Sequence, residues 1–375
     1  MTGRGRLGFI RHDAPAEADP ETTAKAPPID GAEVLDDAIA SALLPERDKR
    51  GHKGAFGKVL VIAGSLDYAG AALLVCRAAG RAGAGLVTLA VPESLQPLFA
   101  AKVVEATTMG LPEDDVEEID PEPALARILD HEHDAIVVGP GLRPGLATAE
   151  LVRLLLTTGE DAGAAPILLD AEALRSIATI EDWWEGDRRP SVLTPHAGEF
   201  ARLRAGSGRD PDADGDLAAD DAARATAARE AAVGWRQVVV LKGAKTVIAA
   251  PDGRVGVAPF ENPALASGGT GDVLAGTIGS LLAQHLAPFD AARLGVYLHG
   301  LAGDTVRDRL GDAGLLASDL ADPIALARKR LTGIAERRKT GGRLGFGARP
   351  PGTGGVAQPD APDVPEVADS TRSAG

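Results

Sequence analysis

The sequence predicts an α/β fold with a mostly parallel central sheet, helices on both faces and a small antiparallel edge. Short, continuous apolar runs bounded by glycine, such as residues 58–64, are typical of strands buried on both faces. Segments with apolar residues at helical spacing alternate with these runs, which implies right-handed crossovers between parallel strands. An Asp-Gly pair at 252–253 separates two apolar runs and predicts an antiparallel hairpin.

In the first half of the chain, regular structure is expected from about residue 34. Val34, Leu35, Ala38, Ile39 and Leu43 form one helical face, and the proline that follows ends this helix. Charged residues then lead into the first buried strand. The elements predicted next are a strand at 58–64, a helix at 70–82, a strand at 86–91, a short helix at 93–101, a strand at 134–139 and a helix at 147–156.

The second half continues the alternation and contains the predicted hairpin. Its expected elements are a strand at 166–170, a helix at 172–177, a strand at 191–194, an acidic loop at 206–216, an Ala-rich helix ending near 233, a strand at 238–242, hairpin strands at 245–250 and 254–258, a glycine-rich helix start near 270, and helices at 289–310 and 318–336. We expect one domain at 30–336, with disordered tails at 1–29 and 337–375 that lack periodicity.

Composition and charge limit the kinds of molecule that this chain is expected to bind. The 375 residues carry a formal net charge of -15, which would repel nucleic acid phosphates and anionic membrane surfaces. No apolar run is long enough to span a bilayer, and the first residues lack the apolar core of a secretory signal, so a cytoplasmic location is expected. The single cysteine, Cys76, excludes an internal disulfide framework, and its apolar helical surroundings predict a buried structural thiol.

The glycine-rich stretch Gly268-Gly269-Thr270-Gly271-Asp272 precedes an apolar helical pattern. The first N–H groups of a helix have no internal partner, so such a loop can bind phosphate or another oxyanion. A carboxylate in the first turn of that helix is placed to act as a general base for a hydroxyl group. The alternative is that Asp272 only caps its helix.

Other polar residues directly follow predicted strands, where ligands bind in doubly wound sheets. Lys242 and Gly243 end one strand, where an ammonium group and close backbone approach suit a nucleotide phosphate; the alternative is a surface lysine. His196 follows another strand, either as a binding group or as part of the turn. Glu199, in the next helical turn, suits the helix dipole or organises a metal ion through water.

Together these and other segments resemble, in order, the ADP-dependent (S)-NAD(P)H-hydrate dehydratase family of the ribokinase-like superfamily. The resemblance covers about residues 33–330. The matching segments are 53–65 (KGAFGKVLVIAGS), 70–72 (GAA), 83–87 (GAGLV), 139–142 (GPGL), 169–171 (LDA), 194–199 (TPHAGE), 241–243 (LKG) and 268–272 (GGTGD).

The resemblance implies ADP-driven dehydration of the (6S) hydrate of NADH or NADPH, giving the reduced cofactor, AMP and phosphate. It also implies Mg²⁺ as cofactor, a separate NAD(P)H-hydrate epimerase as pathway partner, and a homo-oligomer, possibly a tetramer. The site residues it implies are Asp272 as catalytic base; Ala71, Gly141, His196 and Asp272 as hydrate contacts; Lys242, Gly243, Ala244, Lys245, Thr246 and Gly271 as nucleotide contacts; and Glu199 as an indirect metal ligand.

Three alternative functions are less consistent with these residues. A small-alcohol kinase of the hydroxymethylpyrimidine or hydroxyethylthiazole type would use the same loop and the same base; His196 replaces the Asn of the Asn-x-x-Glu found in many such kinases, which favours the dehydratase. A catalytically silent nucleotide-binding regulator would not need Asp272. A nicotinamide dehydrogenase is disfavoured because Gly139-Pro140-Gly141 does not continue into the G-x-G-x-x-G fingerprint.

Overall fold

The computed structural model describes residues 31–158, 164–186, 188–208, 217 and 219–341. The chain divides into two units, Met1–Ala335 and Glu336–Gly375, and the fold described below is that of the first. The tail predicted at 1–29, most of the acidic loop predicted at 206–216 and residues 342–375 lie outside the described residues.

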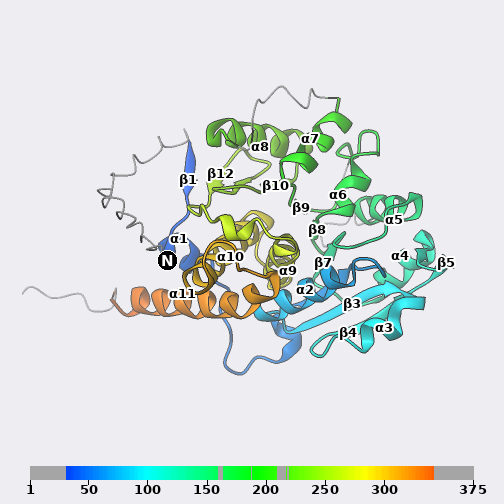
Figure 1. The fold of residues 1–375 in the computed structure, drawn as a ribbon, viewed down its shortest axis with the longest axis horizontal. Helices are drawn as coiled ribbons and strands as arrows, with labels where there is room; N and C mark the ends of the chain where they lie inside the picture. The colour runs from blue at the N-terminus through cyan, green and yellow to red at the C-terminus, as the bar shows by residue number, and fades with distance from the viewer. Residues whose placement is uncertain (1–30, 159–163, 187, 209–216, 218, 342–375) are drawn as a thin grey trace, which may run out of the picture. The chain divides into compact units, whose positions relative to one another are not determined.

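The described residues form a mostly parallel sheet, as predicted (Figure 1). Its order is β1-β12-β11-β10-β9-β8-β7-β2-β3-β4. All neighbours are parallel except β10–β11 and β11–β12, which are antiparallel. The strands are β1 (Ala32–Val34), β2 (Lys58–Ile62), β3 (Leu86–Pro92), β4 (Thr107–Leu111), β7 (Ala135–Val138), β8 (Ile167–Leu169), β9 (Ser191–Leu193), β10 (Val238–Leu241), β11 (Val247–Ala249) and β12 (Val255–Val257).

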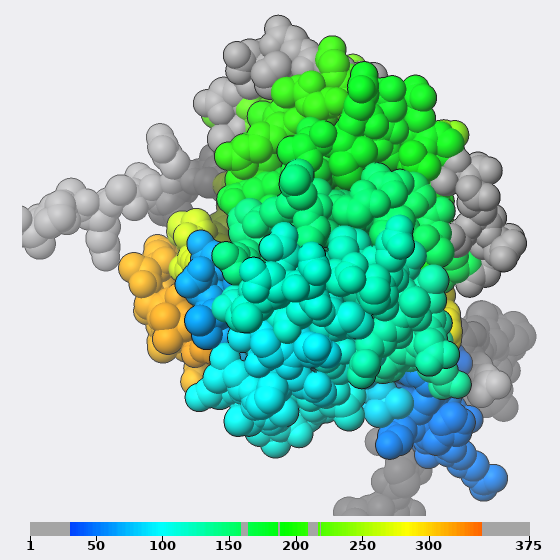
Figure 2. Space-filling model, turned by 90° about the vertical axis from the view of Figure 1, so that its right-hand side faces the viewer, coloured from blue at the N-terminus to red at the C-terminus, as the bar shows by residue number. Residues whose placement is uncertain are grey.

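Helices cover both faces of this sheet. In β2, Val59 and Val61 face one apolar core, and Leu60 and Ile62 face another. The first core contains residues of α2 (Ala69–Arg81), α9 (Thr270–Ala283) and α10 (Pro288–Leu310). The second contains residues of α4 (Pro121–Asp130), α5 (Leu146–Thr157), α6 (Glu172–Ile177), α7 (Ala197–Gly206) and α8 (Asp221–Trp235). The face turned to the viewer in Figure 2 is made mainly by the cyan and green middle of the chain.

Helix α9 is fixed in place by close backbone contacts. A Cβ atom built on Gly276 would lie 2.3 Å from the carbonyl oxygen of Val75 in α2, and one built on Gly279 would lie 2.2 Å from Cγ2 of Val137 in β7. Because only glycine fits at both positions, α9 packs tightly against α2 and the sheet. The N-terminus of α9 is thereby held at a defined place beside the sheet.

Two smaller predictions agree with the structure. Cys76 is buried, and burial raises the pKa of its thiol to about 12, so the group stays protonated near neutral pH. The Asp-Gly hairpin forms as β11 and β12. Strand β1 pairs in parallel with β12, so the hairpin does not form the outermost edge.

The structure differs from the prediction at both ends of the domain. Val34 and Leu35 are not helical: Asp36 accepts the N–H of Ile39 at 2.7 Å and begins α1 (Asp37–Leu43) after β1. The last helix, α11 (Ala321–Gly341), continues past the predicted end at residue 336, with Arg338 and Lys339 in its last turn, where positive charge suits the helix dipole.

Several short elements were not predicted. Between α3 (Gln96–Ala100) and β7 the chain forms β4, β5 (Glu113–Asp115), β6 (Glu118–Ile119) and α4. Four 3₁₀ helices, at Lys53–Phe56, Glu93–Leu95, Pro263–Leu265 and Ala317–Leu320, complete the assigned elements of the described ranges. No helix within those ranges has the length and apolar character needed to cross a membrane.

Candidate active site

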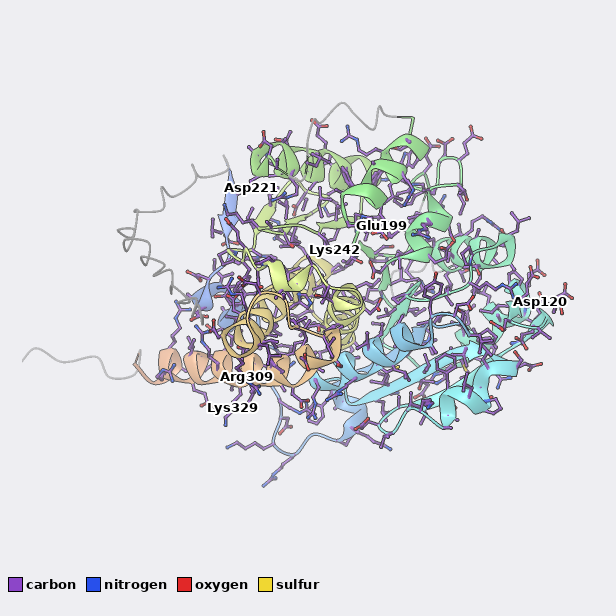
Figure 3. All side chains as sticks on the ribbon, in the orientation of Figure 1. Asp120, Glu199, Asp221, Lys242, Arg309 and Lys329 are labelled. Atoms are coloured by element: carbon purple, nitrogen blue, oxygen red, sulfur yellow. The ribbon has the colours of Figure 1, made fainter. Side chains whose placement is uncertain are left out.

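A cavity of about 850 Å³ lies beside the carboxyl ends of β8, β9 and β10. Its polar side chains come from the segments that follow these strands, from the loop before α9 and the first turn of that helix, and from α10. Figure 3 shows Glu199 and Lys242 near the middle of the view, whereas Arg309 and Lys329 lie toward its lower side. The cavity therefore occupies the position where doubly wound sheets bind ligands.

Lys242 is surrounded by carboxylates. Its Nζ donates a hydrogen bond to Oδ1 of Asp170 at 2.8 Å and lies 3.8 Å from Oε2 of Glu199. Burial on its own would lower the pKa of Lys242, but the charges of Asp170, Glu199 and Asp272 raise it above the ordinary value. Asp170 is 2% exposed and also accepts a hydrogen bond from Oγ1 of Thr194 at 2.9 Å. The lysine therefore stays charged on the cavity wall.

The N-terminus of α7 is closed by its own side chains. Nδ1 of His196 accepts the N–H groups of Gly198 at 3.0 Å and Glu199 at 3.3 Å. Oε2 of Glu199 accepts the N–H of His196 at 2.9 Å, which completes a capping box. Because Nδ1 accepts these two N–H groups, the ring proton is placed on Nε2, which lies 3.5 Å from Oε1 of Glu199. The ring is 54% exposed and lines the cavity.

The N-terminus of α9 is open. Gly269 is its N-cap residue, has φ 87° and offers no side chain to the helix. The N–H groups of Gly271 and Asp272 donate to no acceptor in the described part of the chain. Oγ1 of Thr270 donates to the carbonyl oxygens of Leu265 and Ser267, at 2.8 and 2.9 Å, so this hydroxyl shapes the loop. Two backbone donors and the positive end of the helix dipole are left for a ligand.

Asp272 does not act as a cap. Its carboxyl group lines the cavity and accepts no hydrogen bond from the described residues. Burial, followed by the negative charge of Asp170, raises the pKa of Asp272 to about 7, against the opposing effect of Lys242. A carboxyl group with this pKa gains and loses a proton near neutral pH, as a general base requires.

The structure adds His299, which the sequence analysis did not single out. It is 8% exposed, lines the cavity from α10 and donates from Nε2 to the carbonyl oxygen of Thr270 at 3.0 Å. Burial lowers the pKa of His299 to about 4, so the ring is neutral. This hydrogen bond anchors the first residue of α9 to α10. Its sequence context, an apolar helix, gives no signal of this contact.

The remaining wall of the cavity is largely apolar. Phe260 packs on Tyr297 with ring centroids 5.2 Å apart. A Cβ atom built on Gly300 would lie 2.1 Å from Cδ2 of Phe260, so a glycine is needed where α10 meets this ring. The apolar residues of this wall are Ala258, Phe260, Pro263, Leu265, Leu274 and Val296. The cavity thus combines charged side chains with apolar surface.

Most of the site residues predicted from sequence line this cavity. They are His196, Glu199, Lys242, Gly243, Ala244, Thr246, Gly271 and Asp272. Ala71 and Gly141 do not line it but are neighbours, since a Cβ atom built on Gly141 would lie 3.0 Å from Cβ of Ala71. Lys245 does not line it either: its Nζ lies 3.0 Å from Asp221 and 2.5 Å from Glu261. The ligand contacts expected of these residues stay predictions.

Comparison with known proteins gives a consistent result. A family model described as NAD(P)H-hydrate dehydratase matches residues 59–326. The ADP-dependent (S)-NAD(P)H-hydrate dehydratase of Bacillus subtilis is 36% identical over 289 residues, which cover 77% of this chain and 95% of the relative. The bifunctional NAD(P)H-hydrate repair enzyme of Moorella thermoacetica is 42% identical over 292 residues, 77% of this chain and 52% of the relative. The chain thus spans about half the length of such bifunctional relatives.

Solved structures show the same similarity. An ADP/ATP-dependent NAD(P)H-hydrate dehydratase from Bacillus subtilis, co-crystallized with ATP/Mg²⁺, aligns with a TM-score of 0.66 at 35% identity and covers 80% of this chain and 99% of its own. A ribokinase-like superfamily protein from Enterococcus faecalis aligns with a TM-score of 0.65 at 25% identity, covering 80% of this chain and 97% of its own.

Proposed function

The chain belongs to the NAD(P)H-hydrate dehydratase family, and we propose that it catalyses the ADP-dependent dehydration of the (6S) hydrate of NADH or NADPH. The products would be the reduced cofactor, AMP and phosphate. The observation that carries this proposal lies at the N-terminus of α9, where two backbone N–H groups and the carboxyl group of Asp272 make no hydrogen bond to the described residues. The first suits a phosphoryl group and the second suits a hydroxyl group.

The chemistry explains why a phosphate donor is useful. Hydroxide is a poor leaving group, whereas a phosphate ester leaves readily. Asp272 takes the proton of the hydrate's hydroxyl group, whose oxygen forms a bond to the β-phosphorus of ADP while the bond to AMP breaks. The C–O bond of the ester then breaks with its electron pair on phosphate, assisted by the ring nitrogen. Loss of a ring proton restores the double bond of the reduced cofactor.

The other residues bind and orient the two substrates in this proposal. The N–H groups at the start of α9 and the ammonium group of Lys242 stabilise the transferring phosphoryl group. His196 contacts the hydrate with its exposed imidazole ring, whose Nε2 lies 3.5 Å from Oε1 of Glu199. The nucleotide contacts are Lys242, Gly243, Ala244, Lys245, Thr246 and Gly271, and the further hydrate contacts are Ala71 and Gly141.

The charged residues of the cavity fit Mg²⁺ held through water. Among the described residues that line the cavity, the carboxylates of Asp170, Glu199 and Asp272 outnumber the ammonium group of Lys242, so an ADP anion needs a compensating cation there. Oε2 of Glu199 accepts the N–H of His196, and Oε1, which lies 3.5 Å from Nε2 of His196, would hold a magnesium-bound water molecule. When bound, Mg²⁺ neutralises phosphate charge.

We further propose that a single domain at residues 30–336 catalyses this reaction in the cytoplasm as a homo-oligomer, possibly a tetramer. A separate NAD(P)H-hydrate epimerase is the proposed pathway partner. The names and greater length of the bifunctional NAD(P)H-hydrate repair enzymes support a second activity alongside this one.

The test is recovery of reduced-cofactor absorbance from a defined (6S) hydrate with Mg²⁺ and ADP, ATP or no nucleotide. The proposal predicts recovery with ADP and one AMP released for each reduced cofactor formed. Absence of recovery with either nucleotide would overturn it. A stable phosphorylated alcohol without any reduced cofactor would identify a small-alcohol kinase instead.

A further inference from the structure

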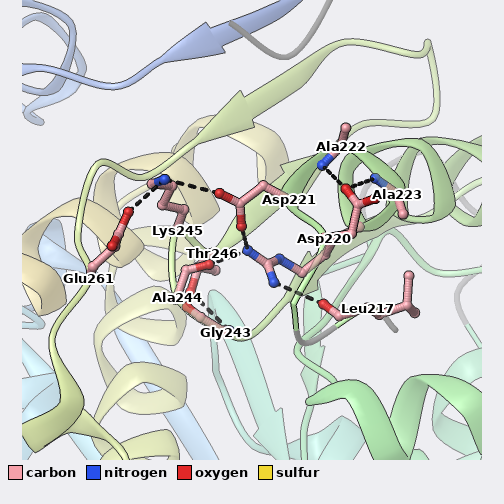
Figure 4. A network of polar contacts seen from close by, with 11 residues as sticks. Leu217, Asp220, Asp221, Ala222, Ala223, Gly243, Ala244, Lys245, Thr246 and Glu261 are labelled. Carbon is pink, nitrogen blue, oxygen red and sulfur yellow. Dashed lines mark hydrogen bonds and ion pairs between the residues drawn. The ribbon is translucent and has the colours of Figure 1, made fainter. Parts of the chain in front are cut away.

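The loop at 243–246 has two sides with different surroundings. Gly243, Ala244 and Thr246 line the cavity. The loop also contacts a group of charged side chains, formed by Asp221 and Arg224 of α8 together with Lys245 and Glu261 (Figure 4). We call these four residues the loop bracket. Glu261 lines the cavity, whereas Asp221, Arg224 and Lys245 do not, so these three reach the ligand site through the loop and through Glu261.

Arg224 of α8 contacts the loop at Gly243 and Ala244. Its side chain is 1% exposed, and its Nη2 donates to the carbonyl oxygen of Ala244 and to Oδ1 of Asp221. Its Nη1 donates to the carbonyl oxygen of Leu217 at 2.8 Å. A Cβ atom built on Gly243 would lie 3.4 Å from Nη1, so the guanidinium group packs directly against the loop. A buried cation is costly unless it is paired, and these contacts tie that pairing to the shape of the loop.

Lys245 holds the loop from the other side. Its Nζ lies 3.0 Å from Oδ2 of Asp221 and 2.5 Å from Oε1 of Glu261. Its backbone N–H donates to the carbonyl oxygen of Phe260 at 2.8 Å. Lys245 has φ 52°, a left-handed conformation that is unfavourable for a non-glycine residue and persists when surrounding contacts impose it. Asp221 thus joins the arginine and the lysine through its two oxygens.

We propose that Asp221, Arg224 and Lys245 are positioning residues for the nucleotide, holding the backbone of 243–246 in the form that binds it. This inference rests on the proposed function, because it takes this loop as the nucleotide site. Lys245 then acts through the loop backbone, while Lys242 is the lysine whose ammonium group faces the ligand. Two lysines three residues apart have different tasks.

In the Asp221→Asn variant, the direction of the change in ADP affinity distinguishes two explanations. If the charged groups near the loop acted only through their electric field, removing a negative charge would tighten ADP binding. The bracket predicts the opposite: loss of the ion pairs to Arg224 and Lys245 loosens the loop and raises the Kd for ADP about tenfold. Isothermal titration calorimetry of the full chain with Mg²⁺ and ADP measures this directly.

Asp220→Asn is the matched control. It removes the same charge one residue earlier, and asparagine still accepts the N–H groups of Ala222 and Ala223 that Asp220 caps. Its Kd for ADP should stay within about twofold of the wild type, since no bracket contact is lost. Lys245→Met should weaken ADP binding about as much as Asp221→Asn, and the double variant should be little worse than either, because both break one network.

Several outcomes would overturn the inference. They are an unchanged or tighter Kd in Asp221→Asn, a lower Tm with ADP affinity unchanged, or no ADP binding by the wild type. In turnover, the bracket predicts that the loss appears in KM for ADP rather than in kcat or in KM for the hydrate. Calorimetry needs no hydrate. A wild type that binds ADP but does not dehydrate the NAD(P)H hydrate would therefore count against the proposed function, while the effect of the bracket variants on ADP binding could still be measured.

Discussion

Helices α7 and α9 begin at the same edge of the sheet, and both N-termini border the cavity, yet they are built in opposite ways. The first turn of α7 is closed by the capping box of His196 and Glu199. The first turn of α9 starts at Gly269, which has no side chain, and leaves backbone donors without an acceptor among the described residues. A helix N-terminus whose N–H groups are already bonded has little to offer a phosphate, whereas an open one has both donors and a favourable dipole.

The acidic residues in the first turns of α7 and α9 have different surroundings. At α7 the acid and the imidazole hold each other: Oε2 of Glu199 accepts the N–H of His196, and Nε2 of His196 lies 3.5 Å from Oε1 of Glu199. At α9 the carboxyl group of Asp272 makes no hydrogen bond to the described residues. An acid in the first turn of a helix is therefore part of a cap in one place and not in the other.

The largest expected effect is at the open terminus. Asp272→Asn preserves the shape of the side chain but removes the base, so kcat should fall about a thousandfold or more. ADP binding should remain, because the N–H groups of α9 are unchanged. Turnover and calorimetry on the same preparation give both quantities. Activity equal to that of the wild type would end the assignment of Asp272 as base.

The pH dependence should report the same group. Because burial and Asp170 raise the pKa of Asp272 to about 7, the ionised base is scarce at low pH. Between pH 5 and pH 7, kcat/KM for the hydrate should rise about fiftyfold and then level off. A profile that is flat from pH 5 to pH 8 in a protein that stays folded would contradict it.

Filling the open terminus should weaken nucleotide binding without unfolding the protein. A Cβ atom on Gly271 would lie 3.5 Å from Nζ of Lys242 and 3.9 Å from Oδ2 of Asp170, which are ordinary contacts. Gly271→Ala should therefore fold normally, while its methyl group takes space from a phosphate and raises the Kd for ADP about tenfold. Gly80→Ala, in α2 with no atom within 4 Å of the new Cβ, is the control and should bind ADP normally.

The smallest effect concerns the closed terminus. His196→Ala removes the acceptor for two N–H groups of α7 and should cost about 1 kcal/mol of stability. His196→Asn can still cap the helix, so its Tm should stay near that of the wild type. Both variants should raise KM for the hydrate, since both lack the imidazole. Equal Tm values for the alanine and asparagine variants would show that the cap contributes nothing.

Much of the fold follows from local sequence patterns. The buried parallel strands are predictable because continuous apolar runs between glycines have few other stable environments. Strand β4 is not, since Thr107 and Thr108 interrupt its apolar pattern where it is less buried. Strand β1 owes its conformation to pairing with β12, more than 200 residues later in the chain, and no local pattern encodes such a contact.

The site divides in the same way. Lys242, His196 and Glu199 were predictable because each follows a strand whose carboxyl end meets the same edge of the sheet. His299 and Phe260 were not, because their places depend on how α10 packs against the loop before α9. That Asp272 does not cap its helix is also a tertiary fact, since capping depends on where the side chain can turn.

In the proposed reaction, ADP bound at the N-terminus of α9 transfers a phosphoryl group to the hydroxyl oxygen of the hydrate before the C–O bond breaks. The most direct test starts from hydrate labelled with ¹⁸O in its hydroxyl group, together with Mg²⁺ and ADP in unlabelled water. The account predicts one ¹⁸O atom in the inorganic phosphate for each reduced cofactor formed, because the oxygen leaves as part of the phosphate. Label found in water, with unlabelled phosphate, would contradict it.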